Sequence, residues 1–383
     1  MSVDTPFYYY DMRLLDRTLA AVKKAASTDE RFRVHYAVKA NADKEILETI
    51  SRADLGADCV SGWEIEAAVA AGFPAEKIVF AGVGKTDREI ELALRAGIGC
   101  FNVESMQELE VIGAIASDLG MTAPVALRVN PNIDAHTHEY ITTGLSENKF
   151  GINLDQLESH IKAALAIPSI SLEGLHFHIG SQITETEPFE MLCETINRIQ
   201  EEYCSCGIMF RNINVGGGLG IDYADPSGHP IPDFDRFFSV FRSNLKVCAG
   251  QKVHFELGRS IVAQCGSLIT RVIYIKEGSV KRFAIVDAGM TDLIRPALYN
   301  AYHKIEKAGA DFKPVHVDSD TLTESYDIVG PICESSDCFS RDVRLPVLHR
   351  GDLLMIRSAG AYGRVMASQY NLRPIPHGLY CKN

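Results

Sequence analysis

The chain has 383 residues, of which 46% are hydrophobic and 23% are charged, a composition typical of globular proteins. Its formal net charge of −12 argues against a nucleic-acid partner, because proteins that bind phosphate backbones concentrate Lys and Arg. No apolar run reaches about 18 residues, and Met1–Pro6 lacks the features of a secretory signal, so we expect no membrane span and no export. The ten cysteines form no CxxC pair, and we therefore expect reduced thiols, no structural metal and a cytoplasmic location.

Eight short segments rich in Val, Ile, Leu or Phe recur along the first two thirds of the chain. They are Val34–Val38, Gly56–Val60, Ile78–Ala81, Gly99–Val103, Val125–Val129, Leu175–Ile179, Ile213–Val215 and Val253–Leu257. Their length and composition predict buried parallel strands.

Seven segments with apolar residues at three- and four-residue spacing lie between these strands, which predicts helices. They are Asp43–Ser51, Gly62–Ala71, Thr86–Ala96, Ser105–Leu119, Leu154–Leu165, Pro188–Cys204 and Asp233–Cys248. Asp43, Ser61 and Thr86 stand where N-terminal caps are expected. Gly72 and Gly97 stand where C-terminal caps are expected.

The alternation of strands and helices predicts a (β/α)8 TIM barrel over residues 12–264, because eight such units fit about 250 residues. A doubly wound open sheet is the alternative. From about Cys265 the pattern changes to strands with turns, at Ser267–Lys276, Phe283–Asp287, Tyr326–Val329 and Asp352–Ile356. We therefore predict a second, mainly β domain over residues 265–383, which residues 1–11 join.

Polar residues and glycines fall at the predicted carboxyl ends of the barrel strands, where barrel enzymes carry their catalytic groups. They are Lys39, Asp58, Arg128, His178, Ser181, Gly216–Gly218 and Glu256–Arg259. Burial disfavours the charge of a lysine, and a lowered pKa suits a lysine that bonds covalently to carbonyl groups. Lys39 is therefore a candidate for such a bond, with a solvated side chain as the alternative.

The glycine run and Glu256 are candidates for two further roles, which are binding a phosphate and holding a ring nitrogen. Asn214–Gly220 offers backbone N–H groups that a phosphate can approach closely, at a strand end where barrels commonly bind phosphate. A carboxylate such as Glu256 can hold a pyridine nitrogen in its protonated form, which makes the ring an electron sink. A salt bridge between Glu256 and Arg259 is the alternative.

His176 and His178 form a His-x-His pair on one strand face, which admits a second class of function, a metal-dependent hydrolase. Such a site needs further ligands, and Arg259 at the end of the eighth predicted strand disfavours a cation, so we expect no metal. His136 and His138 form another pair in a polar loop, where solvated or hydrogen-bonded side chains are expected.

These segments resemble the motifs of the fold type III decarboxylases, an alanine racemase-like family that depends on pyridoxal 5′-phosphate (PLP). Tyr36–Asn41 is similar to the motif of the PLP-binding lysine. The other matching segments, in the family order, are His178–Gln182, Gly216–Gly218, Glu256–Arg259 and Gly330–Asp337. The resemblance covers essentially the whole chain. Leu257 departs from it, because many members have proline there.

The resemblance implies PLP as the cofactor and a role for each matched residue. Lys39 would bind the cofactor covalently, His178 would stack on its ring, and Glu256 would hold the ring nitrogen. The residues implied at the phosphate are Ser181, Gly217, Gly218, Gly258, Arg259 and Tyr362. The residues implied at the far end of the substrate are Arg259, Arg295 and Tyr299 for a carboxylate, Glu334 for an ammonium, and Tyr370 as a closing group. Asp58 and Arg128 would lie behind these groups.

The resemblance also implies a homodimer in which Cys333 and Glu334 come from the partner subunit. Cys333 and Lys39 are the candidate proton donors of the reaction.

Three segments resemble the branch of the family that decarboxylates meso-2,6-diaminopimelate at its D end to L-lysine and CO2, the last step of lysine biosynthesis. They are Arg128–His138 continued by Thr143–Gly144 and Lys149–Gly151, then Asp287–Tyr299, then Cys333–Glu334. A small diamino dicarboxylic acid needs a cation for its distal carboxylate, so Arg295 argues against ornithine. A decarboxylase for carboxynorspermidine or arginine is the alternative. An alanine racemase and a non-catalytic PLP-binding barrel agree less well with the motifs and the length.

Overall fold

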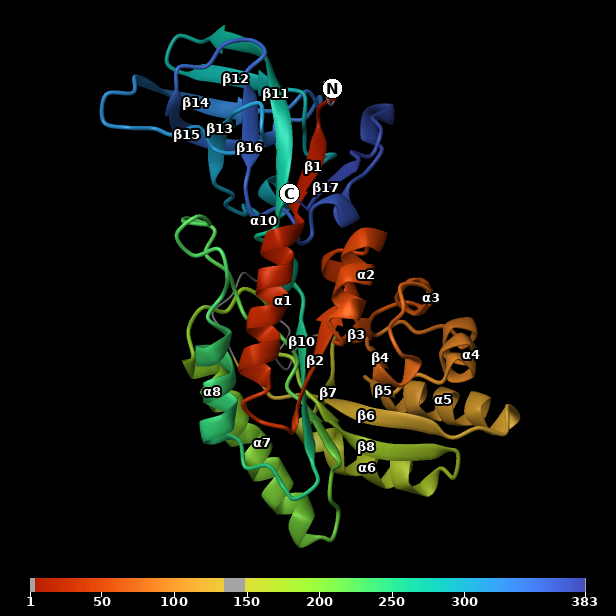
Figure 1. Cartoon of the computed structure of the whole chain (residues 1–383). Coiled ribbons are helices and arrows are strands. Elements are labelled where there is room, and N and C mark those ends of the chain that lie inside the picture. Colours follow the sequence, from red (N-terminus) through yellow and green to blue (C-terminus); the bar gives the residue numbers. More distant parts are fainter. Residues whose placement is uncertain (1–3, 134–148, 383) are drawn as a thin grey trace. The chain divides into compact units, whose positions relative to one another are not determined.

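The computed structural model describes residues 4–133 and 149–382. These residues form two compact units, one of residues 19–220 and 233–258, the other of residues 4–18, 221–232 and 259–382. Each unit contains one sheet (Figure 1). Among the described residues, no helix is long and apolar enough to cross a membrane.

The first unit is a closed barrel of eight parallel strands. In order around the barrel they are β2 (Phe32–Ala37), β3 (Gly56–Cys59), β4 (Ile78–Phe80), β5 (Cys100–Val103), β6 (Ala123–Asn130), β8 (Ile170–His176), β9 (Asn212–Asn214) and β10 (Lys252–Leu257). Pairing of β10 with β2 closes the barrel, and the short strand β7 (Ile152–Asn153) pairs with β6. The prediction of eight strands and of a (β/α)8 barrel is confirmed, and the open sheet is wrong.

Helices lie in all seven segments where they were predicted. They are α2 (Lys44–Arg52), α3 (Gly62–Ala70), α4 (Asp87–Ala96), α5 (Met106–Asp118), α6 (Leu157–Ala166), α7 (Glu187–Ser205) and α8 (Phe234–Asn244), with 3-10 turns η1 (Val38–Ala40), η2 (Ala75–Lys77) and η4 (Leu154–Gln156). Thr86 and Glu89 form a reciprocal capping box at the start of α4, and Gly97 ends that helix with φ 71°, a left-handed conformation that suits glycine. Asp43 precedes α2, but its side chain accepts no capping hydrogen bond.

Helix α8 lies beside α7 (Figure 1). Aromatic rings of α8 pack against the outer face of β10. The side chain of Phe255 on β10 is fully buried. Its ring centroid lies 4.8 Å from that of Phe238 and 5.1 Å from that of Phe241, both on α8. It also lies 4.9 Å from the ring centroid of Phe32 on β2. These edge-to-face contacts add to the free energy gained by burial, so Phe255 is the centre of this part of the core.

The second unit is a mainly β unit, as predicted. Its strands are β11 (Gly266–Glu277), β12 (Arg282–Val286), β13 (Ile305–Ala308), β14 (Thr323–Val329), β15 (Cys338–Pro346), β16 (Leu353–Ile356) and β17 (Gly378–Cys381). The main path of the sheet runs β13-β16-β11-β12-β14-β15. The short helices of the unit are α9 (Arg259–Val262), α10 (Arg295–Tyr299), η5 (Arg364–Met366) and η6 (Tyr370–Leu372). Strands β13, β15 and β17 were not predicted. β15 is an edge strand with charged residues, and edge strands need no continuous apolar run.

The first elements of the chain, β1 (Phe7–Asp11) and α1 (Met12–Ala26), were not predicted either. β1 pairs antiparallel with β11 and parallel with β17, so it belongs to the sheet of the second unit. Tyr8 and Tyr10 of this strand are fully buried. A run of consecutive aromatic residues has no apolar–polar alternation, which explains why the pattern did not reveal a strand here.

Phe255→Ala is expected to lower the free energy of unfolding by about 3–5 kcal/mol, because it removes a buried ring and leaves a cavity. Leu165→Ala, at a side chain on α6 that is 59% exposed, is the control and is expected to change that free energy by less than about 1 kcal/mol. Urea denaturation of both variants measures the difference. A loss at Phe255 no larger than that of the control would show that this ring cluster is not central to the core.

Candidate active site

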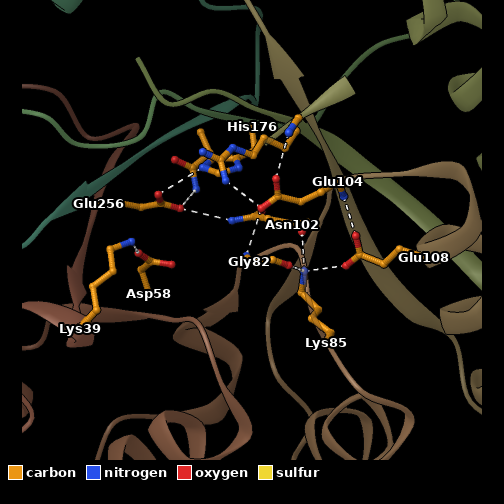
Figure 2. Close-up of polar contacts among 12 residues, drawn as sticks. Lys39, Asp58, Gly82, Lys85, Asn102, Glu104, Glu108, His176 and Glu256 are labelled. Carbon is orange, nitrogen blue, oxygen red and sulfur yellow. Dashed lines mark hydrogen bonds and ion pairs between the residues drawn. The ribbon is translucent and has the colours of Figure 1, made fainter. Parts of the chain in front are cut away.

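Glu256 lies inside the barrel and is hydrogen-bonded from three other strands (Figure 2). Its side chain is 4% exposed. Its Oε1 accepts hydrogen bonds from Asn214 Nδ2 on β9 at 2.7 Å and from Asn102 Nδ2 on β5 at 3.2 Å. Nε2 of His176 on β8 lies 3.1 Å from Oε2. In the strand order β5 is opposite β10, so the Glu256 side chain is held from across the barrel interior.

These contacts keep Glu256 charged. Burial opposes ionisation of the carboxyl, but the hydrogen-bonded imidazole of His176 and the ammonium of Lys39 outweigh burial and hold the pKa of Glu256 below its ordinary value. Hydrogen bonds from the two asparagine amides act in the same direction, because they favour the charged form. Glu256 is therefore a buried anion at neutral pH.

Lys39 lies in the turn η1, since β2 ends two residues before it rather than at it. Its Nζ donates to Oδ2 of Asp58 on β3 at 3.1 Å. The Lys39 side chain is 37% exposed, whereas that of Asp58 is completely buried. Burial and the charge of Glu256 raise the pKa of Asp58 to about 6, against the opposing effect of Lys39. The two carboxyls at this end of the barrel thus differ strongly in acidity.

Lys85 is a second lysine in the barrel unit, and its environment is different (Figure 2). Its side chain is 1% exposed. Its Nζ donates to the backbone oxygens of Gly82 at 2.7 Å and Asn102 at 2.9 Å, and to Glu108 Oε1 at 2.6 Å. An ammonium has three N–H donors, so these acceptors satisfy it completely. Lys85 is a structural cation, and Lys39 is the lysine with an accessible amine.

Arg128 is held by a buried carboxylate, Glu104. Arg128 Nη1 donates to Glu104 Oε1 at 2.7 Å. Glu104 also accepts from the backbone N–H of Gly82 at 3.1 Å and of Gly151 at 2.9 Å. The Arg128 guanidinium lies 4.8 Å from the ring centroid of Phe150. Arg128 and Glu104 therefore connect the Lys149–Gly151 motif to the barrel. The rest of that motif, with His136, His138, Thr143 and Gly144, lies outside the described residues.

The glycine run after β9 permits a close approach of backbone segments. Gly216 and Gly218 have φ 72° and 101°, and a Cβ at Gly217 would lie 1.9 Å from the backbone oxygen of Glu256. The Gly217 N–H donates to Nδ1 of His178 at 3.3 Å. Burial, aided by the charge of Arg128, holds the pKa of His178 well below its ordinary value, so this imidazole is neutral.

The barrel residues match the chemical groups of PLP. Lys39 offers an amine for its aldehyde, Glu256 an anion for its ring nitrogen, His178 a neutral ring, and the glycine run a backbone that a phosphate can approach. Two buried atoms at this end of the barrel, Asp58 Oδ1 and His176 Nδ1, have no hydrogen-bond partner among the residues that the structure describes. Such atoms are uncommon in folded proteins and suit a site that receives a polar group.

A second group of predicted residues lies in the other unit. Arg259 and Arg295 are 5% and 6% exposed. Both donate through Nη1 to the hydroxyl oxygen of Tyr223, at 2.7 Å and 2.8 Å. The Arg259 guanidinium lies 4.9 Å from the ring centroid of Tyr362. Burial opposes the charge of Arg259, but Tyr223, Tyr362 and Tyr299 outweigh burial and raise its pKa.

Arg295 forms no ion pair with any carboxylate in residues 4–133 and 149–382. Burial lowers the pKa of its guanidinium, yet an arginine stays charged at neutral pH. A buried cation without an anion is costly, so Arg295 is prepared for an anionic ligand.

The exposed side chains of Glu334 and Tyr370 are brought together within one chain, where the Tyr370 hydroxyl donates to Glu334 Oε1 at 2.9 Å. Cys333, the neighbour of Glu334, is also exposed. Ser181 and Gly258 lie in the barrel unit. The roles predicted for these five residues, like those of the other site residues, remain predictions.

Sequence reasoning gave no role to five side chains, which are those of Asn102, Glu104, Asn214, Tyr223 and His303. The two asparagines had a signal, since each is a polar side chain within a short buried strand. No sequence signal pointed to Tyr223 and His303, the partners of Arg295. They lie in loops, 72 and 8 positions from it.

Comparisons with known proteins agree with this geometry. The family described as "Pyridoxal-dependent decarboxylase, pyridoxal binding domain" matches residues 13–263. A diaminopimelate decarboxylase from Bacteroides thetaiotaomicron is 53% identical over 98% of this chain and 95% of its own length, and one from Zymomonas mobilis is 42% identical over 97% and 86%. The crystal structure of diaminopimelate decarboxylase from Helicobacter pylori complexed with L-lysine is 40% identical, with a TM-score of 0.91, and the match covers 100% of this chain and 92% of that one.

Lys85→Met is expected to destabilise the barrel by about 3–5 kcal/mol, because it leaves Glu108 as an uncompensated buried charge. Lys162→Met removes the same charge from the exposed pair of Lys162 with Glu158 and is expected to change stability very little. Urea denaturation of the two variants gives the comparison. Equal stabilities would show that the contacts of Lys85 do not support the barrel.

Proposed function

This chain belongs to the diaminopimelate decarboxylase family of pyridoxal-dependent decarboxylases, and we infer that it removes CO2 from meso-2,6-diaminopimelate to give L-lysine, the last step of lysine biosynthesis. The cofactor is PLP, and the substrate is a small diamino acid. The D end of the substrate, by resemblance, loses its carboxylate. The other end keeps its ammonium and carboxylate, which become the α-groups of lysine.

Arg295 is the observation that carries the substrate assignment. A decarboxylase for a simple diamine precursor such as ornithine has no use for a buried, uncompensated guanidinium. A substrate with a second carboxylate supplies the missing anion. We therefore propose that Arg295, together with Arg259 and Tyr299, binds the distal carboxylate.

The barrel residues serve the cofactor. When bound, PLP supplies an electron sink for the electron pair that remains after carbon dioxide leaves. We propose that Lys39 binds it covalently and that Glu256 keeps its ring nitrogen protonated. His178 presents a neutral ring face to it. Ser181, the backbone of Gly217 and Gly218, the Gly258–Arg259 turn and Tyr362 are proposed at the phosphate.

Glu334 is proposed to bind the distal ammonium. Because the Tyr370 hydroxyl donates to Glu334, we propose that Tyr370 acts through this carboxylate by orienting it. The proton that replaces the lost carboxylate is proposed to come from Cys333 or from Lys39, both of which can act as general acids.

We also propose a homodimer in which Cys333 and Glu334 serve the site of the partner subunit. Both residues are exposed, and they follow Lys39 by about three quarters of the chain length. In a two-fold dimer, each site would then combine one barrel with one Cys-Glu segment of the other chain.

We propose that the enzyme is cytoplasmic. All ten cysteines are free, and thiols stay reduced in that compartment.

Arg295→Met is expected to lower kcat/KM for meso-diaminopimelate at least about thirtyfold, because truncating one partner of a buried charged pair costs about 2 kcal/mol or more. The inhibition constant of L-lysine, which keeps the distal carboxylate, should rise in parallel. That of cadaverine, which lacks it, should not change.

Arg344→Met, at an exposed side chain of the same unit, is the matched control. An Arg295→Met enzyme with unchanged relative affinities for L-lysine and cadaverine would show that the carboxylate is bound elsewhere. Release of CO2 from carboxynorspermidine or arginine in preference to diaminopimelate would favour the alternative family branches.

Mixing inactive Lys39→Ala and Glu334→Ala subunits is expected to restore activity, since a heterodimer then contains one intact site. Random assortment makes half of the dimers mixed, which gives about a quarter of wild-type activity. Lys39→Ala mixed with Glu256→Gln is the control. Both changes lie in the barrel, so no site is intact and no activity should return. No rescue by Glu334→Ala, with subunit exchange shown by mass spectrometry, would contradict the shared site.

A further inference from the structure

Tyr223 lies between two buried cations. Its hydroxyl oxygen accepts a hydrogen bond from Nη1 of Arg259 at 2.7 Å and from Nη1 of Arg295 at 2.8 Å. Two guanidinium groups that contact the same oxygen repel each other, and the repulsion is strong because both are buried. An uncharged oxygen that accepts from both reduces this cost and fixes the spacing of the two arginines.

The hydrogen of the Tyr223 hydroxyl is left to donate. A phenol oxygen carries one O–H donor besides its acceptor capacity, and arginine has only donors, so neither Arg259 nor Arg295 can receive that hydrogen. No acceptor for it is found in the part of the chain that the structure describes. The group therefore offers a hydrogen bond at the place where an anion would neutralise the arginines.

His303 fixes the orientation of Arg295 from another direction. Its Nδ1 lies 2.8 Å from the backbone oxygen of Arg357, and its Nε2 lies 3.0 Å from Arg295 Nη1. A carbonyl oxygen can only accept and a guanidinium can only donate, so Nδ1 carries the hydrogen and Nε2 accepts. Burial and the charge of Arg295 lower the pKa of His303 to about 3, which keeps this acceptor neutral.

These two contacts determine which edge of the Arg295 guanidinium remains available to bind a ligand. Nη1 has two hydrogens, and Tyr223 and His303 take both. Nε and Nη2 of Arg295 have no acceptor among the described residues. Together they form the planar edge that binds a carboxylate through two parallel hydrogen bonds.

We propose that Tyr223 donates a hydrogen bond to the distal carboxylate of the substrate beside those of Arg295, and that His303 is a positioning residue that turns the Nε–Nη2 edge of Arg295 toward it. This inference rests on the proposed function, because it needs a substrate with a distal carboxylate. Tyr223 is then a specificity-determining residue. A substrate without that carboxylate leaves the Tyr223 hydroxyl hydrogen and the Nε–Nη2 edge of Arg295 without this acceptor.

Tyr223→Phe tests the donor while keeping the ring, whose centroid lies 5.2 Å from that of His303. KM for meso-diaminopimelate and the inhibition constant of L-lysine should rise about tenfold to a hundredfold, the effect of losing one hydrogen bond to a charged group. The value of kcat should stay within about threefold, and the inhibition constant of cadaverine should not change.

His303 is tested by a pair of variants. His303→Leu removes the acceptor and should weaken L-lysine binding. His303→Gln should restore it, because an amide can accept from Arg295 through its oxygen and donate to the Arg357 carbonyl through its nitrogen. If Gln and Leu weaken L-lysine binding equally, the positioning role is wrong. Rescue by Gln supports it even if Tyr223→Phe folds poorly.

Arg295→Met in the same assay distinguishes a failure of the role proposed for Tyr223 from a failure of the proposed distal carboxylate site. If Arg295→Met weakens L-lysine binding and Tyr223→Phe does not, the role of Tyr223 is overturned and the proposed function stands. If neither variant changes the preference for L-lysine over cadaverine, the assignment of the distal carboxylate site itself is wrong.

Discussion

The constraint on which the rest of the barrel depends is the buried negative charge of Glu256. A carboxylate in a protein interior remains charged only if hydrogen-bond donors and cations surround it. Asn102, Asn214 and His176 supply the donors from three different strands, and Lys39 supplies a cation. Polar side chains therefore surround Glu256 inside the barrel, where barrels usually contain branched apolar side chains.

This polar environment gives different pKa values to two carboxyls, those of Glu256 and Asp58, that would otherwise have similar acidity. Glu256 is stabilised as an anion, while burial and that same anion raise the pKa of Asp58 to about 6. Divergent acidities of neighbouring groups are typical of catalytic sites, where each group has a different task. The apolar burial that stabilises the fold comes instead from outside the barrel wall, where Phe255 and the rings of α8 pack.

The second unit contains buried positive charge instead of buried negative charge. Its cations Arg259 and Arg295 share one phenol oxygen, and Arg295 has no carboxylate partner among the described residues. Uncompensated buried charge lowers stability, a cost that active sites commonly carry for function. Lys85 shows the contrast, because its three acceptors satisfy it completely.

The sequence alone predicted the barrel, and it identified candidate site residues at the ends of the strands. Strands such as β6 and β10 are apolar runs, and Lys39 and Glu256 stand out because charges at the ends of such runs need a reason. Composition could not reveal that Asn102 reaches Glu256 across the barrel, since that contact depends on closure of the sheet. The role of Tyr223 could not be predicted either. A tyrosine in a loop gains its role only when the folded chain brings two distant arginines into contact with it. Strand β1 was missed because consecutive aromatic residues show no alternation.

The state of the cofactor nitrogen tests the central claim most directly. The enzyme reconstituted with PLP that carries ¹⁵N in its ring gives a nitrogen chemical shift by NMR that distinguishes the protonated from the neutral ring. With Glu256 held as an anion, the shift should report a protonated nitrogen throughout about pH 6–9, and Glu256→Gln should move it to the neutral value. A neutral ring nitrogen in the wild-type enzyme at pH 7 would contradict the account.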